Sequence, residues 1–338
     1  MTKTPLILTS SRLNAGGDEA EPRVDFLEIA CALNGTLSYP AVGGGFFARV
    51  EEKTASDWRQ AWAARRHPAS AYLSLSEKVG LPLALLPGRR VPHILLAHHL
   101  TSARKRAMQV RLGYLHRFDR IIVLCAAQAE YLRREAGVPE ERIRLMMDKV
   151  DHRFFMPQGA EPSGYILSVG RERRDYETLM TAVEPLGIPT VIVASSPWSR
   201  QGHEQGGKIP SNVTLKRGLS FLELRALYDA AALVVVPLQK GTDYAAGVNG
   251  VLEAMAMRKP LIVSQTPGLS DYIDEGETAL FAPAADPDAL RAVIERLWAD
   301  QALGARLSVN ARKVVEAGRN LDAYVATVAG IVREVASE

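Results

Sequence analysis

A glycine-bearing loop that runs into a helix is the segment best suited to chemistry. An apolar run ends at Pro237, and the loop after it carries Gly247 and Gly250, where a helical pattern begins. The start of a helix presents unpaired backbone N–H groups and the positive end of the helix dipole. This segment is therefore a candidate anion-binding site.

Glu253 follows in the same pattern, in what we predict to be the first turn of the helix. A carboxylate there can accept hydrogen bonds from a vicinal diol such as a ribose, as an acidic residue does in dinucleotide-binding folds. The alternative is that Glu253 only complements the helix dipole, because acidic residues are common in first turns. Spacing alone favours the alternative.

Three arginines lie in a second loop, which again follows an apolar run and precedes a helical pattern that Asp175 could cap. They are Arg171, Arg173 and Arg174. Ligands of open α/β sheets bind at the carboxyl ends of strands. Guanidinium groups there can pair with a diphosphate through planar, charge-assisted hydrogen bonds. A solvated basic turn with ion pairs to neighbouring glutamates explains the same residues equally well.

His98 and His99 follow a third apolar run, residues 93–97, and precede a helical segment rich in Arg and Lys. A histidine at a strand end can contact a sugar hydroxyl or move a proton, because its pKa lies near neutrality. A hydrogen-bonded loop histidine is the plainer interpretation. The basic segment could meet phosphate or lipid headgroups, although a solvated face is the commoner case.

Gly16 and Gly17 come after the first predicted strand. Glycines let the backbone approach a ligand closely, but they also occur in ordinary tight turns. The run Gly43–Gly45 is a weaker signal, since no clear helical pattern follows it.

Neither a metal site nor a disulfide framework is expected. The two cysteines, Cys31 and Cys125, each lie in an apolar stretch, which favours buried thiols. No group of His, Cys and carboxylate residues has the spacing of metal ligands. We therefore expect neither a metal nor a bound cofactor.

Length and composition limit the class of protein. A chain of 338 residues suggests about two domains, and 47% apolar with 23% charged residues is a globular composition. A net charge of +3 is too small to indicate nucleic-acid binding, yet it suits a phosphorylated ligand or an anionic membrane surface. The sequence contains neither a signal-peptide core nor ~20 consecutive apolar residues. We expect a cytoplasmic protein, with peripheral contact at the inner face of the membrane left open.

Short apolar runs alternate with helical patterns, which predicts the α/β class with parallel sheets. In the first half we expect strands at 5–9, 71–75, 93–97 and 120–124, and helices at 23–33, 56–64, 102–116 and 126–136. In the second half we expect strands at 165–169, 190–194, 213–216, 233–237, 261–264 and 279–281. The helices expected there are 175–183, 220–230, 250–257, 287–299, 304–317 and 321–335. Residues 34–55 give no readable pattern.

Turn-forming residues cluster between Asp151 and Gly164 and place a domain boundary there. We expect an N-terminal domain at 1–157, a C-terminal domain at 158–318, and a last helix at 319–338 that packs back on the N-terminal domain.

In this order the segments resemble the retaining glycosyltransferases of the GT-B fold, in particular the family 4 type, the group 1 glycosyl transferases. The similarity covers most of residues 90–315 and is carried by Val138–Asp151 with Phe155 and Pro157, Tyr165–Arg171, Ala246–Pro260, Pro267–Ile273 and Glu275–Thr278. It implies two Rossmann-like domains that face each other across a cleft. It also implies transfer of a sugar from a nucleotide diphosphate sugar, with retention of configuration and without a metal.

The resemblance assigns roles to individual residues. Glu253 would bind the ribose, Arg171 and Arg174 the diphosphate, and His98 or His99 the transferred sugar. Leu219 would flank the base. The implied donor-binding set is Gly16, Gly17, Gly170, Arg171, Arg173, Arg174, Leu219, Asp243, Gly247, Val248, Asn249, Gly250 and Glu253, and the implied catalytic set is His98, His99, Arg171 and Arg174.

Two positions depart from the family pattern. The family commonly carries two glutamates separated by seven residues, but the first position here is Ala245, with Asp243 nearby as a substitute. Arg173 and Arg174 stand where a Lys-Gly pair is usual. The base and the sugar stay open, as does the choice among saccharide, lipid and small-molecule acceptors. A catalytically weak nucleotide-sugar binding protein, or another GT-B reaction such as epimerisation or phosphorolysis, is the alternative.

Overall fold

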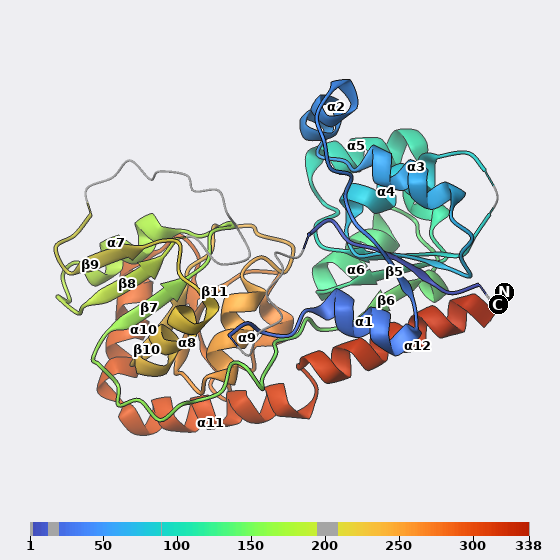
Figure 1. The fold of residues 1–338 in the computed structure, drawn as a ribbon. Helices are drawn as coiled ribbons and strands as arrows, with labels where there is room; N and C mark the ends of the chain where they lie inside the picture. The colour runs from blue at the N-terminus through green and yellow to red at the C-terminus, as the bar shows by residue number, and fades with distance from the viewer. Residues whose placement is uncertain (1–2, 13–19, 89, 195–208, 338) are drawn as a thin grey trace. The chain divides into compact units, whose positions relative to one another are not determined.

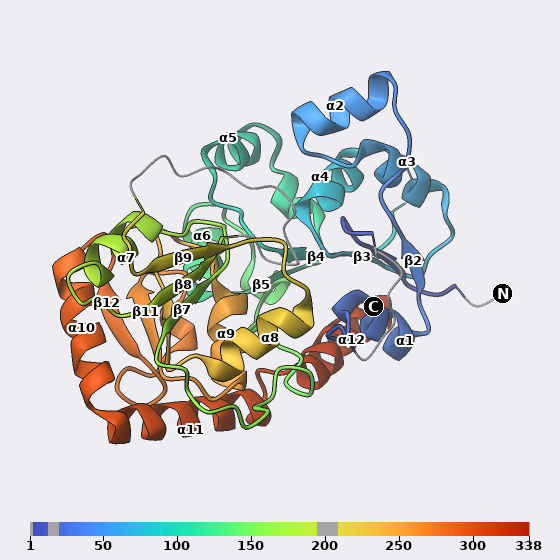
Figure 2. The same cartoon turned by 60° about the vertical axis from the view of Figure 1, so that its left-hand side comes forward.

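The structure is a computed structural model that describes residues 3–12, 20–88, 90–194 and 209–337. Its contacts divide the chain into two compact units. The first unit contains residues 23–147 and 322–337 together with the N-terminal strand, and the second contains residues 148–321. Each unit is a parallel sheet with helices, as Figures 1 and 2 show, so the predicted α/β class is confirmed.

The first unit is built on a six-stranded parallel sheet in the order β2-β1-β3-β4-β5-β6. Its strands are β1 (Leu6–Leu8), β2 (Thr36–Ser38), β3 (Tyr72–Ser74), β4 (His93–Ala97), β5 (Arg120–Val123) and β6 (Ile143–Leu145). Its helices are α1 (Asp25–Leu33), α2 (Phe46–Thr54), α3 (Trp58–Arg66), α4 (Glu77–Leu85), α5 (Ala103–Leu112), α6 (Ala126–Arg134) and most of α12 (Leu321–Ser337).

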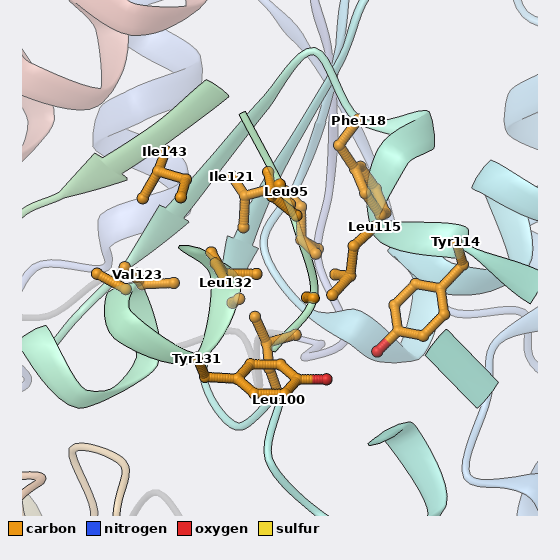
Figure 3. Close-up of a cluster of buried hydrophobic side chains, with 14 of the residues drawn as sticks. Leu95, Leu100, Tyr114, Leu115, Phe118, Ile121, Val123, Tyr131, Leu132 and Ile143 are labelled. Atoms are coloured by element: carbon orange, nitrogen blue, oxygen red, sulfur yellow. The ribbon is translucent and has the colours of Figure 1, made fainter. Parts of the chain in front are cut away.

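Apolar side chains of the central strands form the core of the first unit. In Figure 3, Leu95 of β4 and Ile121 of β5 gather with Leu132 of α6, and all three are fully buried. A strand buried on both faces consists mainly of apolar residues. This is why the runs at 93–97 and 120–124 could be recognised in the sequence.

The second unit has a six-stranded parallel sheet in the order β12-β11-β10-β7-β8-β9. Its strands are β7 (Ile166–Val169), β8 (Thr190–Val193), β9 (Val213–Lys216), β10 (Leu233–Val236), β11 (Leu261–Gln265) and β12 (Leu280–Pro283). Its helices are α7 (Tyr176–Val183), α8 (Phe221–Ala230), α9 (Val248–Ala256), α10 (Pro287–Ala299) and α11 (Gln301–Ala317). Read from the other edge, this is the strand order of dinucleotide-binding folds. The strand order reverses between β7 and β10.

Side-chain caps fix where the helices of the second unit begin. Asp175 accepts a hydrogen bond from the backbone N–H of Thr178 at the start of α7, which confirms the predicted cap. Ser220 and Glu223 form a reciprocal capping box on α8. These caps set the positions at which the loops after β7 and β9 end.

Arg312 of α11 holds the segment that opens the second unit. Its Nη1 donates to the backbone oxygens of His152, Phe155 and Ala256 at 3.2, 2.9 and 2.7 Å. Residues 148–157 therefore group with the second unit, and the division falls between Met147 and Asp148.

Helix α12 makes polar contacts within the first unit. Arg23 Nη1 lies 2.7 Å from Asp322 Oδ1. Glu334 Oε1 accepts from Arg120 at 2.8 Å and from Arg144 at 3.0 Å. No helix in the described ranges is long and apolar enough to cross a membrane.

Four of the described strands and α-helices were not among those expected from the sequence: β2, α2, α4 and β6. Helix α4 is buried at every position from Val79 to Ala84 and contains Pro82, so it lacks a one-sided apolar period. Helix α2 buries none of its residues, and β2 is a short edge strand.

The prediction of two buried thiols is wrong for Cys31. Cys31 is exposed and Cys125 is buried, and both are free thiols. Helix α1 directs Phe26, Ile29 and Ala30 into the core, and Cys31 is one position beyond that stripe.

Candidate functional site

The candidate site of the second unit lies where β7 and β10 meet. In open α/β sheets a crevice forms outside the carboxyl ends of the two strands at which the order reverses. The loops leaving these strands are joined here by backbone hydrogen bonds. Asp175 N donates to Pro237 O at 3.1 Å, and Gln239 N donates to Arg173 O at 2.9 Å. The two predicted loops, the arginine loop and the glycine loop, therefore start side by side.

Arg174 is buried at this junction, with 6% of its surface exposed. Its Nε and Nη2 donate to Val169 O at 3.0 and 2.8 Å, and Nη1 donates to Glu172 O at 3.1 Å. The interpretation of this residue as part of a solvated basic turn is therefore wrong. A guanidinium has five N–H groups, and the three used here fix its plane against the end of β7.

Three glycines make room for the Arg174 guanidinium. A methyl group at Gly170 would overlap it, and one at Gly247 would lie 2.9 Å from Nη1. One at Gly250 would lie 3.4 Å from Nη2. Gly170 and Gly247 also have left-handed φ angles of 112° and 92°, which only glycine adopts readily. Arg174 thus connects the end of β7 to the N-terminus of α9.

Helix α9 begins with backbone N–H groups that have no acceptor among the described residues. Gly247 is its N-cap residue and supplies no capping side chain. In the described part of the chain, the N–H groups of Asn249 and Gly250 donate to no other residue. Together with the helix dipole and the neighbouring guanidinium, they form a positive region suited to an anion.

Glu253 lies in the second turn of α9, because the helix begins at Val248; its predicted first-turn position is wrong. The residue is 4% exposed, and its Oε2 accepts a hydrogen bond from the Tyr228 hydroxyl at 2.8 Å. Burial and the adjacent Glu253 carboxylate raise the pKa of Tyr228 well above its usual value, so the phenol stays a donor. A carboxylate placed in this way does more than complement the helix dipole.

The other predicted residues of this unit lie around that centre. Arg171 and Asp243 are half-buried in the two loops. Arg173 is exposed, and its Nη1 donates to Gln239 Oε1 at 3.0 Å. Val248 is buried and Asn249 exposed at the start of α9. Leu219 is half-buried in the turn between β9 and α8.

Sequence reasoning missed three tyrosines that support these loops. The Tyr176 hydroxyl donates to Gly170 O, and burial raises the pKa of Tyr176 to about 12. The Tyr244 hydroxyl donates to Glu172 Oε1 at 2.7 Å. Tyr228 comes from α8, far from Glu253 in sequence, so no local spacing could have revealed its role.

In the first unit, Glu77 holds the loop that carries His98 and His99. Its Oε1 accepts the backbone N–H groups of both residues, at 3.0 and 2.7 Å, and lies 3.3 Å from Lys105 Nζ. Burial is the largest single influence and would raise the pKa of Glu77, but Lys105, His98 and the N–H donors together lower it. Glu77 is therefore a buried carboxylate, and no pattern in the sequence indicated its role.

The two histidines differ in their surroundings. His98 is exposed, and its Nε2 lies 3.0 Å from Leu75 O, so Nε2 carries the proton because a carbonyl can only accept. His99 is half-buried. Leu100, the next residue, donates from its backbone to Gln128 Oε1 at 2.7 Å. Gly16 and Gly17 lie outside the described residues.

The second unit matches a known family. Residues 164–300 match the family model "Glycosyl transferases group 1". Alpha-D-kanosaminyltransferase of Streptomyces kanamyceticus is 33% identical over 85 residues, which are 25% of this chain and 22% of that protein. MMP alpha-(1->4)-mannosyltransferase of Mycolicibacterium hassiacum is 26% identical over 228 residues, which are 61% of this chain and 51% of that protein. The match spans about half or less of these curated relatives.

Solved structures match nearly the whole chain. Sucrose-phosphate synthase from Thermosynechococcus elongatus has a TM-score of 0.76 at 21% identity, covering 98% of this chain and 99% of that chain. Anabaena Alr3699/HepE in complex with UDP-glucose has a TM-score of 0.72 at 14% identity, covering 99% and 100%. At these identities the likeness concerns the fold. The chain therefore has the GT-B fold, with two α/β units that each contain a parallel sheet, and its residues 164–300 match the group 1 glycosyl transferases.

Proposed function

We propose that this protein transfers a sugar from a nucleotide diphosphate sugar to an acceptor, with retention of anomeric configuration. The observation that carries the proposal is the buried Arg174 guanidinium, fixed between the end of β7 and the glycine-lined start of α9. A charge buried at a strand-order reversal, beside unpaired N–H groups, suits a diphosphate. The family match of the second unit and the named activities of its relatives support the same function.

In this proposal the donor binds mainly through the second unit. The N–H groups of Asn249 and Gly250 donate to the diphosphate oxygens, and the side chains of Arg171 and Arg174 add positive charge. The carboxylate of Glu253, positioned by the Tyr228 hydroxyl, accepts hydrogen bonds from the hydroxyls of the ribose. Leu219 flanks the base. Backbone N–H groups and buried side chains thus bind the nucleotide diphosphate. The exposed loops are then available to select the sugar.

The chemistry follows from where charge develops. As the bond between sugar and phosphate breaks, negative charge grows on the leaving diphosphate and the sugar gains oxocarbenium character. Donors already aimed at that charge stabilise the transition state, and removing one such donor costs about 3 kcal/mol in comparable sites. His98 or His99 contacts the sugar or relays a proton. Neither a metal ion nor a bound cofactor is part of this scheme.

The test is release of nucleotide diphosphate from common nucleotide sugars, with and without saccharide, lipid and small-molecule acceptors. We expect Arg171→Ala and Glu253→Gln to reduce turnover by about 100-fold or more. Arg296→Ala is the matched control, because Arg296 is exposed on α10. Its turnover should equal that of the parent. Absence of acceptor-dependent release with every donor would refute the proposal.

The second candidate is a nucleotide-sugar binding protein without turnover, and one observation favours it. Ala245, half-buried before α9, replaces a glutamate that the family commonly carries. In that case nucleotide diphosphates would raise the melting temperature, with about 2.7 kcal/mol of added stability at 100 times the Kd. Arg171→Ala and Glu253→Gln would abolish this shift, while the parent would show no product with any acceptor.

A further inference from the structure

The most exposed large apolar side chains gather in the first unit. In the described residues, those more than half exposed are Val42 (72%), Phe46 (75%), Phe47 (65%) and Val110 (86%). They belong to α2, to the loop before it, and to α5. Both views place α2 and α5 at the same end of the first unit (Figures 1 and 2). Single exposed apolar residues are ordinary, but such a gathering marks an interaction surface.

Helix α2 leaves the two phenylalanines at its start largely uncovered by the described part of the chain. None of its nine residues is buried, and Phe46 and Phe47 stand together at its first turn with ring centroids 5.7 Å apart. An ion pair joins this helix to α3, since Glu51 Oε2 lies 2.7 Å from Arg59 Nη2. A helix this short gains little stability by itself. Two adjacent phenylalanines at its exposed start are best explained by a partner that covers them.

Helix α5 supplies positive charge beside these apolar residues. Residues 103–117 contain five Arg and Lys residues and no Asp or Glu. Two of the cations are engaged inside the unit, since Lys105 pairs with Glu77 and Arg106 with Glu135. Arg104 and Arg111 are exposed, and neither forms an ion pair within the described residues.

Arg104 and Arg111 border a hollow on α5. The hollow measures about 390 Å³ and is completed by Ala107, Met108 and Leu112. Two guanidinium groups around an apolar floor match a phosphate headgroup above acyl chains, because guanidinium binds phosphate in a planar, two-point manner.

We propose that the basic apolar surface, defined as Val42, Phe46, Phe47, Arg104, Val110, Arg111 and Leu112, binds an anionic phospholipid bilayer. Amphipathic helices bind bilayers in this way, with aromatic and aliphatic side chains at the headgroup boundary and Arg or Lys beside them. The four most exposed apolar side chains come from α2, the loop before it and α5, and none of them lines the hollow, which suits a fluid surface better than a folded partner. The inference is independent of sugar transfer, because it needs neither donor nor acceptor.

Co-sedimentation of the full chain with vesicles tests the proposal. One set of vesicles is phosphatidylcholine, and the other is phosphatidylcholine mixed with phosphatidylglycerol. We expect binding to the mixed vesicles that weakens with added salt, because charges at a surface are screened. Arg104→Gln with Arg111→Gln should lower the partition constant by about 25-fold, at roughly five-fold for each cation. Phe46→Ser with Phe47→Ser should reduce it by at least ten-fold.

Two matched changes in the second unit serve as controls, Arg296→Gln for charge and Leu222→Ser for an exposed apolar side chain. Both should bind vesicles like the parent. Equal binding to the two kinds of vesicle, or unchanged binding by the double variants, would overturn the proposal.

A second measurement does not require a variant of the basic apolar surface with weaker vesicle binding. Phe46→Trp should add fluorescence that brominated lipids quench, beyond any quenching of the four native tryptophans seen in the parent, whereas Leu222→Trp should add no quenched fluorescence. Absence of quenching at position 46 would also overturn the proposal. Donor turnover measured on the same samples separates a failure here from a failure of the proposed transferase activity.

Discussion

Replacing Arg174 should separate the stability of the second unit from its affinity for the donor. The guanidinium is 6% exposed and makes three hydrogen bonds to two backbone carbonyls. Arg174→Lys keeps a buried charge, but a single ammonium cannot reproduce the planar fork. Arg174→Met removes both the charge and the bonds. The two variants therefore test whether charge or geometry matters.

The magnitudes follow from those bonds. A hydrogen bond to a charged group contributes about 1.5 to 3 kcal/mol, so the loss of two bonds in Arg174→Lys should cost about 3 kcal/mol of unfolding free energy. In Arg174→Met the lost bonds are partly offset, because burying a guanidinium itself costs several kcal/mol. A net loss of about 1 to 2 kcal/mol is expected for that variant. Methionine should thus be tolerated better than lysine for stability, although it should bind the donor more weakly.

Urea unfolding and donor titration together check this order. For a unit of this size, about 3 kcal/mol corresponds to a fall in melting temperature of roughly 6–12 °C. Arg173→Lys is the adjacent control, since Arg173 is exposed and its Nη1 donates to the side chain of Gln239; its unfolding free energy should change by less than about 0.5 kcal/mol. If lysine at position 174 were as stable as arginine, the argument from fork geometry would be wrong.

Three further changes probe the supporting residues. Tyr228→Phe removes the hydroxyl that donates a hydrogen bond to Glu253. Losing one buried hydrogen bond to a charged group should raise the KM for the nucleotide sugar about ten-fold. An unchanged KM would contradict the inference that Tyr228 positions Glu253. Burial lowers the pKa of His93 to about 3. As the pH falls through 6.5, this imidazole is therefore protonated in the unfolded chain but stays neutral in the folded chain. Stability should therefore fall by about 2 kcal/mol between pH 7 and pH 5, and urea unfolding should show no such fall in His93→Gln. Glu77→Gln weakens the hydrogen bonds that position the His98–His99 loop. It should lower kcat about ten-fold with little change in the KM for the nucleotide sugar. Equal effects on kcat and KM would argue against this role of Glu77.

The sequence predicted most elements of the second unit, and the reason is physical. Strands buried on both faces appear as short apolar runs, and the caps at Asp175, Ser220 and Asp286 mark where helices begin. Strand β9 and helix α10 have the predicted bounds. In the first unit, α4 was missed because it is apolar on all sides, and α2 because its apolar residues face solvent.

The candidate site was predicted as a set of loops but not as a set of contacts. Spacing placed Arg174 at a strand end, yet burial of its charge depends on three glycines from two loops far apart in sequence. Glu253 was assigned to the wrong turn because Gly247, not a polar side chain, caps α9. Its partner Tyr228 and the loop-holding Glu77 act through tertiary contacts, which no single-sequence pattern encodes.

These contacts divide the candidate site into a fixed part and a variable part. Arg174 and Glu253 are buried and bonded to the protein, so changes there alter the shape of the second unit itself. Asp243 and Ala245 lie in the half-buried loop before α9, where a side chain can change without disturbing that frame. We infer that the diphosphate and ribose are bound by the fixed part, whereas the identity of the sugar is set at positions 243–245 and at the histidine loop. On this argument, restoring a glutamate with Ala245→Glu should change which nucleotide sugar is turned over while the Kd for the nucleotide diphosphate stays within about three-fold. A large loss of nucleotide affinity in that variant would show that the two parts are not separable.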